Sequence, residues 1–339
     1  MLMVIFGAGA SYDSAPDYPP LVPKAWPADH RESRPPLANE LFENRPLFAD
    51  VLAAYSDCHA VITRLRDLAA GSSVEHELEE LQMDADEDPR RKIQLAAIRF
   101  YLQQLIWTCE GRWNSQFAKG ITNYKTLLGL IQHLRRPEEK VCLVTFNYDT
   151  MLEQSLPFTK IRTFTDYIAP PYIMIKLHGS VNWAHPVRAI NSSDIPRTVP
   201  SVIEKVTELE ISREYIMATM HSAGRFDAEP YFPALAIPVE RKKSYECPDI
   251  HLDALRTSLP EVHKTLVIGW NATEEYFLHM LSEELQGNVL GMVVNGGRGS
   301  AEEVIKRLKD GGVRGEFTPS DMGFTDFMRT RQADEFLKK

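Results

Sequence analysis

Residues 172–183 read YIMIKLHGSVNW, and this stretch decides the fold. A short apolar run that ends in glycine and polar residues is typical of a buried parallel strand. In open sheets of such strands, ligands lie beyond the carboxyl ends. We therefore expect His178, which follows the apolar run, to emerge where a ligand would bind. For a single histidine taken alone, a turn histidine satisfied by main-chain groups is the commoner situation.

Other segments of strand and helix character surround this stretch. Apolar runs of strand length lie at residues 2–6, 141–146, 235–239, 265–270 and 289–294, and helical patterns follow at 276–285, 301–309 and near 321–327. Pro238 places the run at 235–239 at the end or edge of a sheet. Residues 186–234 are interpreted as irregular, apart from a short helix at 202–209. The alternation predicts an α/β fold, a Rossmann-like parallel sheet with helices on both faces.

The first apolar run is followed at once by GAGAS at residues 7–11. A strand, a glycine turn and small residues open a dinucleotide-binding unit, because glycines let the backbone approach a pyrophosphate and the following amides can donate to it. The usual third glycine is absent, so the fingerprint is incomplete. Gly7, Ala8, Gly9 and Ser11 are candidate cofactor-binding residues, and a plain strand-to-helix turn is the alternative.

Residues 12–36 are rich in proline, which predicts an ordered loop or a lid rather than a helix. A loop of this length beside a phosphate-binding turn is more often functional than idle. Arg31 and Arg34 are within reach of a phosphate in such a loop. Solvated loop charges are nevertheless the commoner situation for arginines of this kind.

Residues 37–136 carry apolar side chains at helical spacing, between two apparent strands of the sheet. We interpret residues 38–137 as a large all-α insertion into a core formed by 1–37 and 138–339. The acidic run at 84–88 favours a solvated loop, because no glycine or distal glutamate completes a calcium loop. Glu75 and Glu79 are expected on the surface of a helix.

Asn147 and Asp149 directly follow the strand at 141–146 and precede a helix. Residues of these types are common helix caps. The functional alternative is that Asn147 points into a site at the strand end, and spacing alone leaves both interpretations open.

The composition of the 339 residues is that of an ordinary globular protein, with 44% hydrophobic and 25% charged residues. The formal net charge of -9 argues against direct binding to nucleic acid. Four widely spaced cysteines without a Cys-x-x-Cys pair fit a reducing cytosol and no zinc ribbon. No apolar run approaches the roughly 18 residues that span a membrane, and the start of the chain is expected to be a strand rather than a signal peptide.

Five motifs occur in a characteristic order along the chain. They are GAGAS at 7–11, TFNYD at 145–149, KLHGS at 176–180, IGW at 268–270 and VN at 294–295. The set resembles the sirtuin superfamily, and more closely the bacterial sirtuin-like NAD hydrolases of anti-phage defence. PPLANELF at 35–42 and IGWNATEE at 268–275 resemble stretches of the same group. The resemblance covers residues 1–42 and 140–300, but not the helical block.

The resemblance implies a role for each matching position. It implies that Gly7, Gly9 and Ser11 bind the NAD pyrophosphate, and that Gly269 and Asn295 border the phosphates and the adenosine ribose. Asn147 would hold the water or ribose near the anomeric carbon, Asp149 would line the nicotinamide pocket, and His178 would be the general base. The other histidines considered, His185, His221 and His251, have no such motif and are interpreted as structural.

The sequence departs from the protein deacylases of this superfamily at two points. The four zinc cysteines are absent, and Phe146 stands where a glutamine precedes the motif asparagine. Both departures put protein deacylation in doubt, and neither touches the glycosidic chemistry. No zinc is expected, and water becomes the default acceptor.

The expected function is that of an NAD+ glycohydrolase, which releases nicotinamide and ADP-ribose. An imidazole can accept the proton of water, and an asparagine amide can orient the nucleophile. By resemblance, the enzyme would be a cytoplasmic effector of antiviral abortive infection that works as a homo-oligomer. The helical insertion would be its contact surface, and a separate sensor such as a HerA-type ATPase its partner. The alternatives are an NAD-dependent deacylase or ADP-ribosyltransferase, and a non-catalytic sensor of NAD or ADP-ribose.

Overall fold

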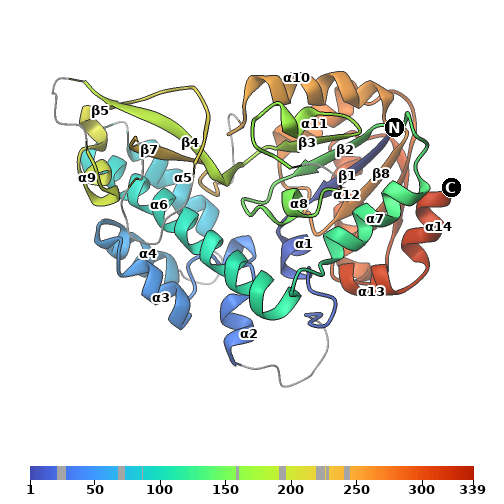
Figure 1. Cartoon of the computed structure of the whole chain (residues 1–339), viewed down its shortest axis with the longest axis horizontal. Helices are drawn as coiled ribbons and strands as arrows, with labels where there is room; N and C mark the ends of the chain where they lie inside the picture. Colours follow the sequence, from blue (N-terminus) through green and yellow to red (C-terminus); the bar gives the residue numbers. More distant parts are fainter. Residues whose placement is uncertain are drawn as a thin grey trace.

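The computed structural model describes residues 1–20, 28–67, 73–85, 87–157, 160–190, 196–218, 226, 229–239 and 245–339. His221 and one residue of the acidic run, Asp86, lie outside these ranges. Figure 1 shows two lobes, one built on a parallel sheet and the other on helices with a small antiparallel sheet. Both chain ends lie on the parallel-sheet lobe (Figure 1). Within the described ranges, no helix is long and apolar enough to cross a membrane.

Six parallel strands form the main sheet, in the order β10-β9-β8-β1-β2-β3. Their bounds are β1 Leu2–Phe6, β2 Val141–Thr145, β3 Tyr172–Lys176, β8 Lys264–Ile268, β9 Val289–Val294 and β10 Gly315–Pro319. Every residue of β1, β2 and β3 is buried, as expected for a parallel sheet covered on both faces. The chain moves outward from β1 through β2 and β3, then returns to the other side of β1. This is the strand order of the doubly wound dinucleotide fold, so the predicted Rossmann-like sheet is confirmed.

The register of the sheet brings the carboxyl ends of its central strands to the same level. Phe6 at the end of β1 pairs with Thr145 of β2 and with Ile268 of β8. Thr145 in turn pairs with Lys176 of β3, and Ile268 pairs with Val294 of β9. Residues that follow these five strands therefore leave the sheet along a single edge.

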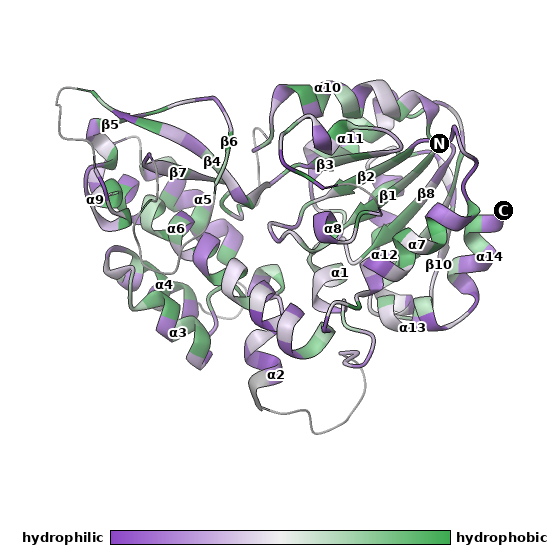
Figure 2. Cartoon of the chain, viewed as in Figure 1, coloured by the Kyte–Doolittle hydropathy of each residue, from purple (hydrophilic) through white to green (hydrophobic). Residues whose placement is uncertain are grey.

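Helices cover both faces of the main sheet. Those of this lobe are α1 Ala8–Tyr12, α7 Asn123–Leu134, α8 Met151–Gln154, α10 Asp249–Ser258, α11 Glu275–Glu284, α12 Arg298–Asp310, α13 Phe324–Arg329 and α14 Gln332–Lys338. α7, α13 and α14 pack together on one side, and α10 and α11 lie on the opposite side (Figure 1). In Figure 2, β1, β2 and β8 are hydrophobic ribbons beneath helices of mixed hydropathy, which is the pattern of a covered core.

The second lobe combines helices with an antiparallel sheet. Its elements are α2 Ala28–Ser33, α3 Pro46–Leu52, α4 His59–Arg66, α5 Val74–Asp84, α6 Pro89–Arg112, α9 Val199–Glu204, β4 Gly179–Ala189, β5 Leu209–Ile211, β6 Ile216–Met217 and β7 Tyr231–Leu235. Short 3-10 turns of this lobe lie at Ala38–Glu40, Ser56–Cys58 and Val206–Glu208, and two others, Asp166–Ile168 and Leu259–Glu261, pack against the main-sheet lobe. A separate hydrophobic core joins buried residues of 41–109 to buried residues of 181–237.

The boundaries between the two hydrophobic cores differ from the predicted ends of the helical insertion at residues 38 and 137. Trp113 and the apolar face of α7, including Leu127 and Ile131, pack into the core of the main sheet. Val181 and Phe232, which the sequence placed with the sheet core, pack against the helices. The predicted insertion is thus part of a mixed lobe, because helical periodicity shows which face of a helix is apolar but not which core receives it.

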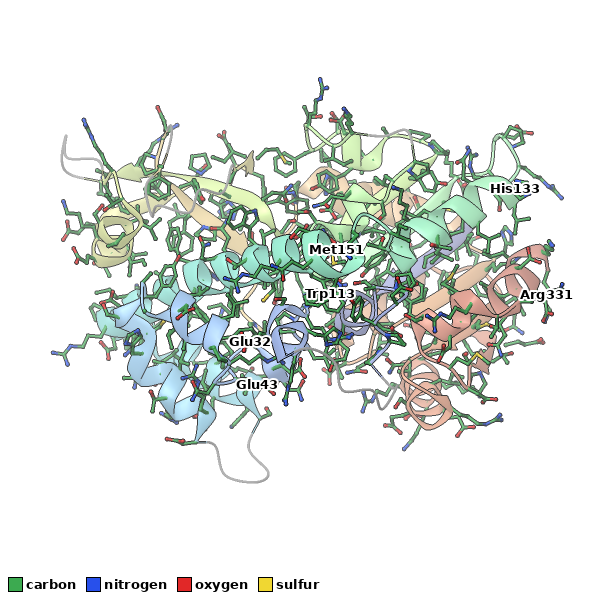
Figure 3. All side chains as sticks on the ribbon, turned by 60° about the horizontal axis from the view of Figure 1, so that its bottom comes forward. Glu32, Glu43, Trp113, His133, Met151 and Arg331 are labelled. Carbon is green, nitrogen blue, oxygen red and sulfur yellow. The ribbon has the colours of Figure 1, made fainter. Side chains whose placement is uncertain are left out.

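The long helix α6 connects the lobes. Asp88 caps it by accepting a hydrogen bond from Arg90 N at 2.8 Å, and its middle is buried in the second core. At its carboxyl end the chain forms a π-helical turn, Trp113–Ala118, and the Trp113 indole donates to Ser14 Oγ at 2.9 Å. Figure 3 shows Trp113 and Met151 near the centre of the molecule and His133 and Arg331 at its edge.

Several local predictions were wrong. Residues 12–36 contain a helix, α2, which starts after the last proline of the first cluster. The strand expected at 235–239 lies at 231–235, where Pro233 is accommodated because β7 pairs with β4 alone. Residues 186–234 contain the end of β4 together with β5 and β6, and the tail contributes β10 and α14. β10 alternates intermediate and exposed residues at the sheet edge, so it lacks the apolar run that marks the central strands.

Candidate active site

Five predicted residues follow five neighbouring strands of the main sheet. Across the sheet they are His178 after β3, Asn147 after β2, Gly7 after β1, Gly269 after β8 and Asn295 after β9. At a strand spacing of about 4.8 Å, this row spans about 19 Å. The boundary between β1 and β8 is the topological switch point of the sheet, where ligands bind in open α/β folds.

A cleft of about 1470 Å³ runs along this edge. It is lined by all nine residues predicted from the sequence: Gly7, Ala8, Gly9, Ser11, Asn147, Asp149, His178, Gly269 and Asn295. Asn39, Ser73, Glu75 and Ile106 line it from the side of the second lobe. The cleft therefore lies between the lobes, and Glu75, expected as an ordinary surface residue of a helix, borders it.

The glycines of the two turns hold each other in place. Gly9 N donates to Gly269 O at 3.0 Å, and Gly7 N donates to Ile268 O at 3.0 Å. A Cβ on Gly7 would lie 2.4 Å from Gly269 O, and Gly269 itself has a φ of +62°. These positions require glycine because two backbone turns touch. The amides of Gly7 and Gly9 are used within the protein, so the turn offers a ligand a surface bare of side chains rather than those two donors.

Ser11, Asn147 and Asp149 meet in one buried hydrogen-bonded group with Tyr124 of α7. Ser11 Oγ donates to Asp149 Oδ2 at 2.7 Å and lies 2.9 Å from the Tyr124 hydroxyl. Asn147 Nδ2 lies 2.9 Å from Ser11 Oγ and 3.0 Å from the Tyr124 hydroxyl. Asp149 Oδ1 accepts from Met151 N at 3.1 Å at the start of α8. Asp149 thus both satisfies an amide at the start of α8 and lines the cleft.

The amide of Asn147 is fixed in one orientation. Its Nδ2 donates to the Gly7 carbonyl at 2.9 Å, and a carbonyl can only accept, so the nitrogen must face it. Its Oδ1 has no hydrogen-bond partner within the described part of the chain, although the residue is only 6% exposed. A buried acceptor left unsatisfied costs about 1–3 kcal/mol. A hydroxyl group or a water molecule bound beside this oxygen would satisfy it.

His178 is 6% exposed and lies against an aromatic wall. Its ring meets Phe146 edge-on, with centroids 4.9 Å apart, and lies 6.2 Å from the ring of Tyr148. Phe146 stacks on Trp270 at 5.2 Å with the planes 7° apart. Ala236 N donates to the His178 carbonyl at 3.0 Å, which fixes the main chain. Phe146, the departure from the deacylase motif, therefore belongs to the wall that shapes this end of the cleft.

Buried carboxyl groups lie behind the Asn147–Asp149 segment. Burial and the neighbouring Asp149 raise the pKa of Glu110, on α6, to about 7. Glu110 accepts hydrogen bonds from Thr150 N at 2.8 Å, Thr150 Oγ1 at 2.5 Å and Gln154 Nε2 at 2.6 Å. Burial also raises the pKa of the Tyr124 hydroxyl well above its usual range, so this group remains a donor.

The opposite end of the cleft is more polar. Asn295 Nδ2 donates to Asn271 Oδ1 at 3.1 Å. Arg307 Nη1 donates to Asn271 O at 2.8 Å, and its Nη2 lies 3.4 Å from Glu303 Oε1. Arg307 thus brings a cation to the end of the cleft that Asn295 borders.

The arginines of the proline-rich segment do not face the cleft as phosphate ligands. Arg34 is 3% exposed, donates to Tyr12 O and to Tyr18 O at 2.7 Å, and lies over the Trp113 ring at 4.6 Å. Burial lowers the pKa of its guanidinium to about 10. It is therefore a structural cation rather than a solvated one, while Arg31 is largely exposed.

Other sequence candidates have structural partners. His185 lies between Glu214 O and the Glu246 carboxylate, each 2.9 Å away, and His251 Nε2 is 2.8 Å from Phe164 O. Neither is among the residues that line the cleft. The four cysteines are buried and free. Across the described segments, no group of three or more histidine, cysteine, aspartate or glutamate side chains could hold a metal ion.

Tyr124, Glu110 and Lys176 hold the site residues from behind the cleft, and the sequence did not reveal these contacts. Tyr124 and Glu110 lie in helical segments whose periodicity looked purely structural, and only the fold brings them to the end of β2. Lys176 interrupts an apolar strand, and this interruption was the one available signal.

No protein-family model matches the chain, and no curated protein sequence is similar to it. Solved structures of Sir2 proteins are similar at a low level. One, in complex with the inhibitor EX-527, 2'-O-acetyl-ADP-ribose and a deacetylated p53 peptide, is 12% identical over 99% of this chain and 94% of that chain, with a TM-score of 0.40. Another, with a p53 peptide and NAD+, is 11% identical over 99% and 93%, with a TM-score of 0.37. Likenesses at this level do not establish membership of a family.

Proposed function

We propose that the protein is an NAD+ glycohydrolase that releases nicotinamide and ADP-ribose. The observation that carries this proposal is the unsatisfied Oδ1 of Asn147, an acceptor locked in orientation at the end of β2, beside the strand that leads to His178. A rigid, buried acceptor in a cleft is suited to orient a hydroxyl group or a water molecule. The strand order and the bare glycine turn at the switch point support a dinucleotide as the ligand.

The row of strand ends gives the dinucleotide a direction. In this proposal the nicotinamide ribose lies at Asn147 and His178, the pyrophosphate crosses the turns at Gly7 and Gly269, and the adenosine reaches Asn295. The side chain of Ser11 holds Asp149, and Ala8 borders the pyrophosphate. Arg307 adds positive charge at the adenosine end, beside the carboxylate of Glu303.

The chemistry requires positioning and one proton acceptor. The bond between the anomeric carbon and nicotinamide breaks, and its electron pair goes to the ring nitrogen, which discharges the pyridinium and gives a neutral leaving group. The ribose passes through an oxocarbenium-like state. The oxygen of water then adds to the anomeric carbon, and the proton passes to His178 and on to solvent. Asn147 Oδ1 accepts a hydrogen bond from the water or a ribose hydroxyl and so aligns the attack.

The first test is incubation of the purified protein with NAD+ alone. We expect nicotinamide and ADP-ribose in equal amounts, and a decrease of about 100-fold or more in Asn147→Ala and His178→Ala. His133→Ala, on the exposed edge of α7, is the matched control and should retain activity (Figure 3). Nicotinamide release that requires an acyl-peptide would show that the protein is a deacylase. Transfer of ADP-ribose to protein would show that it is a transferase.

We further propose that this activity serves antiviral defence, which the motif resemblance supports. Cells that express the wild type should lose NAD after phage infection, whereas cells with His178→Ala should keep it and cells with His133→Ala should behave as wild type. Unchanged NAD in infected wild-type cells, with or without a HerA-type ATPase, would contradict the defence role. We also propose a cytoplasmic location and assembly into a homo-oligomer through the helical segment 38–137, and mass photometry of the purified protein tests the assembly.

A further inference from the structure

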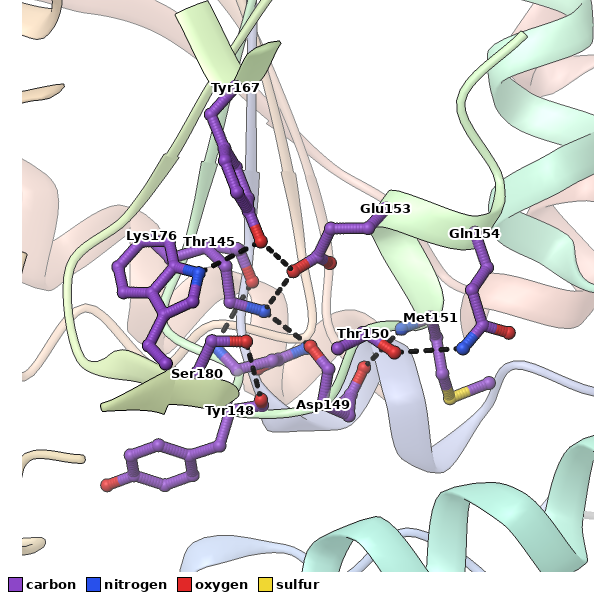
Figure 4. A network of polar contacts seen from close by, with 12 residues as sticks. Thr145, Tyr148, Asp149, Thr150, Met151, Glu153, Gln154, Tyr167, Lys176 and Ser180 are labelled. Carbon is purple, nitrogen blue, oxygen red and sulfur yellow. Dashed lines mark hydrogen bonds and ion pairs between the residues drawn. The ribbon is translucent and has the colours of Figure 1, made fainter. Parts of the chain in front are cut away.

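Lys176 is fully buried at the last position of β3, an otherwise apolar strand. Its ammonium lies 2.8 Å from Glu153 Oε1 and donates to the main-chain carbonyl of Asp149. Figure 4 shows the ammonium between these two groups. A lysine is almost never fully buried unless it is paired, and burying the pair costs several kcal/mol per ion.

The contact of Lys176 with Asp149 joins the two segments that carry the candidate catalytic groups. Lys176 lies two positions before His178, and Asp149 lies two positions after Asn147. The ammonium therefore ties the turn that follows β2 to the end of β3. Lys176 is not among the residues that line the cleft, so it acts through the Asp149 carbonyl.

Neighbouring bonds reinforce the same junction. Val181 N donates to Tyr148 O at 2.9 Å. Ser180 Oγ donates to the same oxygen at 3.2 Å (Figure 4). On the other side, the Tyr167 hydroxyl donates to Glu153 Oε1 at 3.2 Å and accepts from the Trp183 indole at 3.0 Å. The ion pair is thus held by groups from β3, β4, α8 and the turn at Asp166–Ile168.

The pair is not arranged for stability alone. Glu153 Oε2 is buried without a hydrogen-bond partner in the described ranges. Buried ion pairs are often replaced by apolar residues with little loss or even a gain of stability, so stability is a weak reason for such a pair. The main-chain contact to Asp149, which an apolar side chain cannot make, is the feature that remains to be explained.

We propose that Lys176, paired with Glu153, is a positioning residue that holds the Asn147–Asp149 segment in register with His178. This inference rests on the proposed hydrolysis of NAD+. It predicts that loss of the donor at position 176 misaligns the water held by Asn147 while leaving the rest of the dinucleotide site intact.

Two neutral double variants test the proposal. Lys176→Met/Glu153→Gln removes the charge and the donor, whereas Lys176→Gln/Glu153→Gln removes the charge and keeps an N–H donor for the Asp149 carbonyl. We expect kcat to fall by about 100-fold in the first variant with little change in KM, and to be partly restored in the second at a similar Tm. Arg45→Met/Glu40→Gln, which removes a buried ion pair of the second lobe, is the control and should keep kcat.

Hydrogen exchange separates this proposal from the proposed function. Residues 147–152 should exchange faster in Lys176→Met/Glu153→Gln, while β1 and β8 keep their protection. A folded variant with wild-type kcat, or with unchanged protection at 147–152, would overturn the positioning role.

If the wild type itself releases no nicotinamide, the proposed function fails, and hydrogen exchange alone then tests whether Lys176 holds residues 147–152 in place. If a double variant does not fold, Glu153→Gln replaces it, with kcat expected to persist at a lower Tm, and loss of kcat there overturns the proposal.

Discussion

Asn147 donates a hydrogen bond of 2.9 Å to the carbonyl of Gly7, although 140 positions separate the two residues. The bond joins the end of β2 to the glycine turn after β1, and it orients the amide so that Oδ1 is the unsatisfied atom. The candidate catalytic asparagine and the candidate dinucleotide turn are therefore parts of one hydrogen-bonded unit.

Asn147→Asp should abolish the hydrogen bond to Gly7 with almost no change in the shape of the side chain. A carboxylate cannot donate to the Gly7 carbonyl, and it would place a charge beside Asp149 in a buried site. We expect nicotinamide release to fall by about 100-fold or more, and the free energy of unfolding to fall by about 1–3 kcal/mol. Kinetics and urea denaturation measure the two effects, and wild-type activity in Asn147→Asp would contradict the role of the amide.

Ser11→Ala should destabilise the buried hydrogen-bonded group beside the cleft, because Ser11 holds Asp149. Ser11 Oγ is the donor to Asp149 Oδ2 at 2.7 Å, so its removal leaves that oxygen without this bond in a buried position. We expect a loss of about 1–3 kcal/mol in the free energy of unfolding. Ser115→Ala, which removes an exposed hydroxyl that bonds within its own helical turn, is the control and should change stability little. Equal stability of the two variants would show that the buried group does not depend on Ser11.

Gly269→Ala should disrupt both glycine turns. The residue has a φ of +62°, and an added Cβ would lie 2.2 Å from Ala10 N. The left-handed conformation alone costs a non-glycine residue about 1–3 kcal/mol. By contrast, Gly129→Ala on α7 meets no atom within 4 Å and should stabilise the helix by about 0.5–1 kcal/mol. Thermal denaturation compares the two, and a Gly269→Ala protein as stable as wild type would contradict the close approach of the turns.

Glu110 should make stability depend on pH near neutrality. Burial raises its pKa from 4.5 to about 7, so the folded protein binds this proton more tightly than the unfolded chain. Its stabilising contribution is complete below about pH 4.5 and is lost as the pH rises through about 7, with a total of about 3 kcal/mol. Relative to Glu110→Gln, the free energy of unfolding of the wild type should therefore fall between pH 5 and pH 8.

Urea denaturation at several pH values measures this difference. Glu316→Gln, an exposed substitution on β10, provides the control and should follow the wild type at every pH. A difference between wild type and Glu110→Gln that does not change with pH would show that Glu110 has the same pKa in both states.

The central strands and the turns that follow them were predictable from local residues. Apolar runs bounded by glycine or asparagine mark β1, β2, β3, β8 and β9 because these strands are buried on both faces. β5, β6 and β10 escaped prediction, since each is partly exposed and β5 and β6 have only three and two residues. The helix α2 also escaped prediction, because it is short and directly follows a proline-rich stretch.

The site was predictable as a set of strand-end residues, but its internal contacts were not. Gly7, Asn147, His178, Gly269 and Asn295 each follow an apolar run, so their place at one sheet edge follows from a parallel fold. Tyr124, Glu110 and Lys176 join them through contacts of side chains that arise from helices or from within a strand. Such contacts depend on how helices pack on the sheet, which no local pattern encodes.

By itself, the sequence determined the five central strands of the main sheet, which turns need glycine, and the order in which the motifs appear. Only the tertiary structure decided that strand ends from positions 6, 145, 176, 268 and 294 lie level, and that Asn147 is held by Gly7 with its Oδ1 left without a hydrogen-bond partner in the described part of the chain. The physical reason is the distance along the chain over which each kind of interaction acts. Local patterns reflect burial of neighbouring residues, whereas register and hydrogen bonding across the sheet are set by the packing of the whole chain.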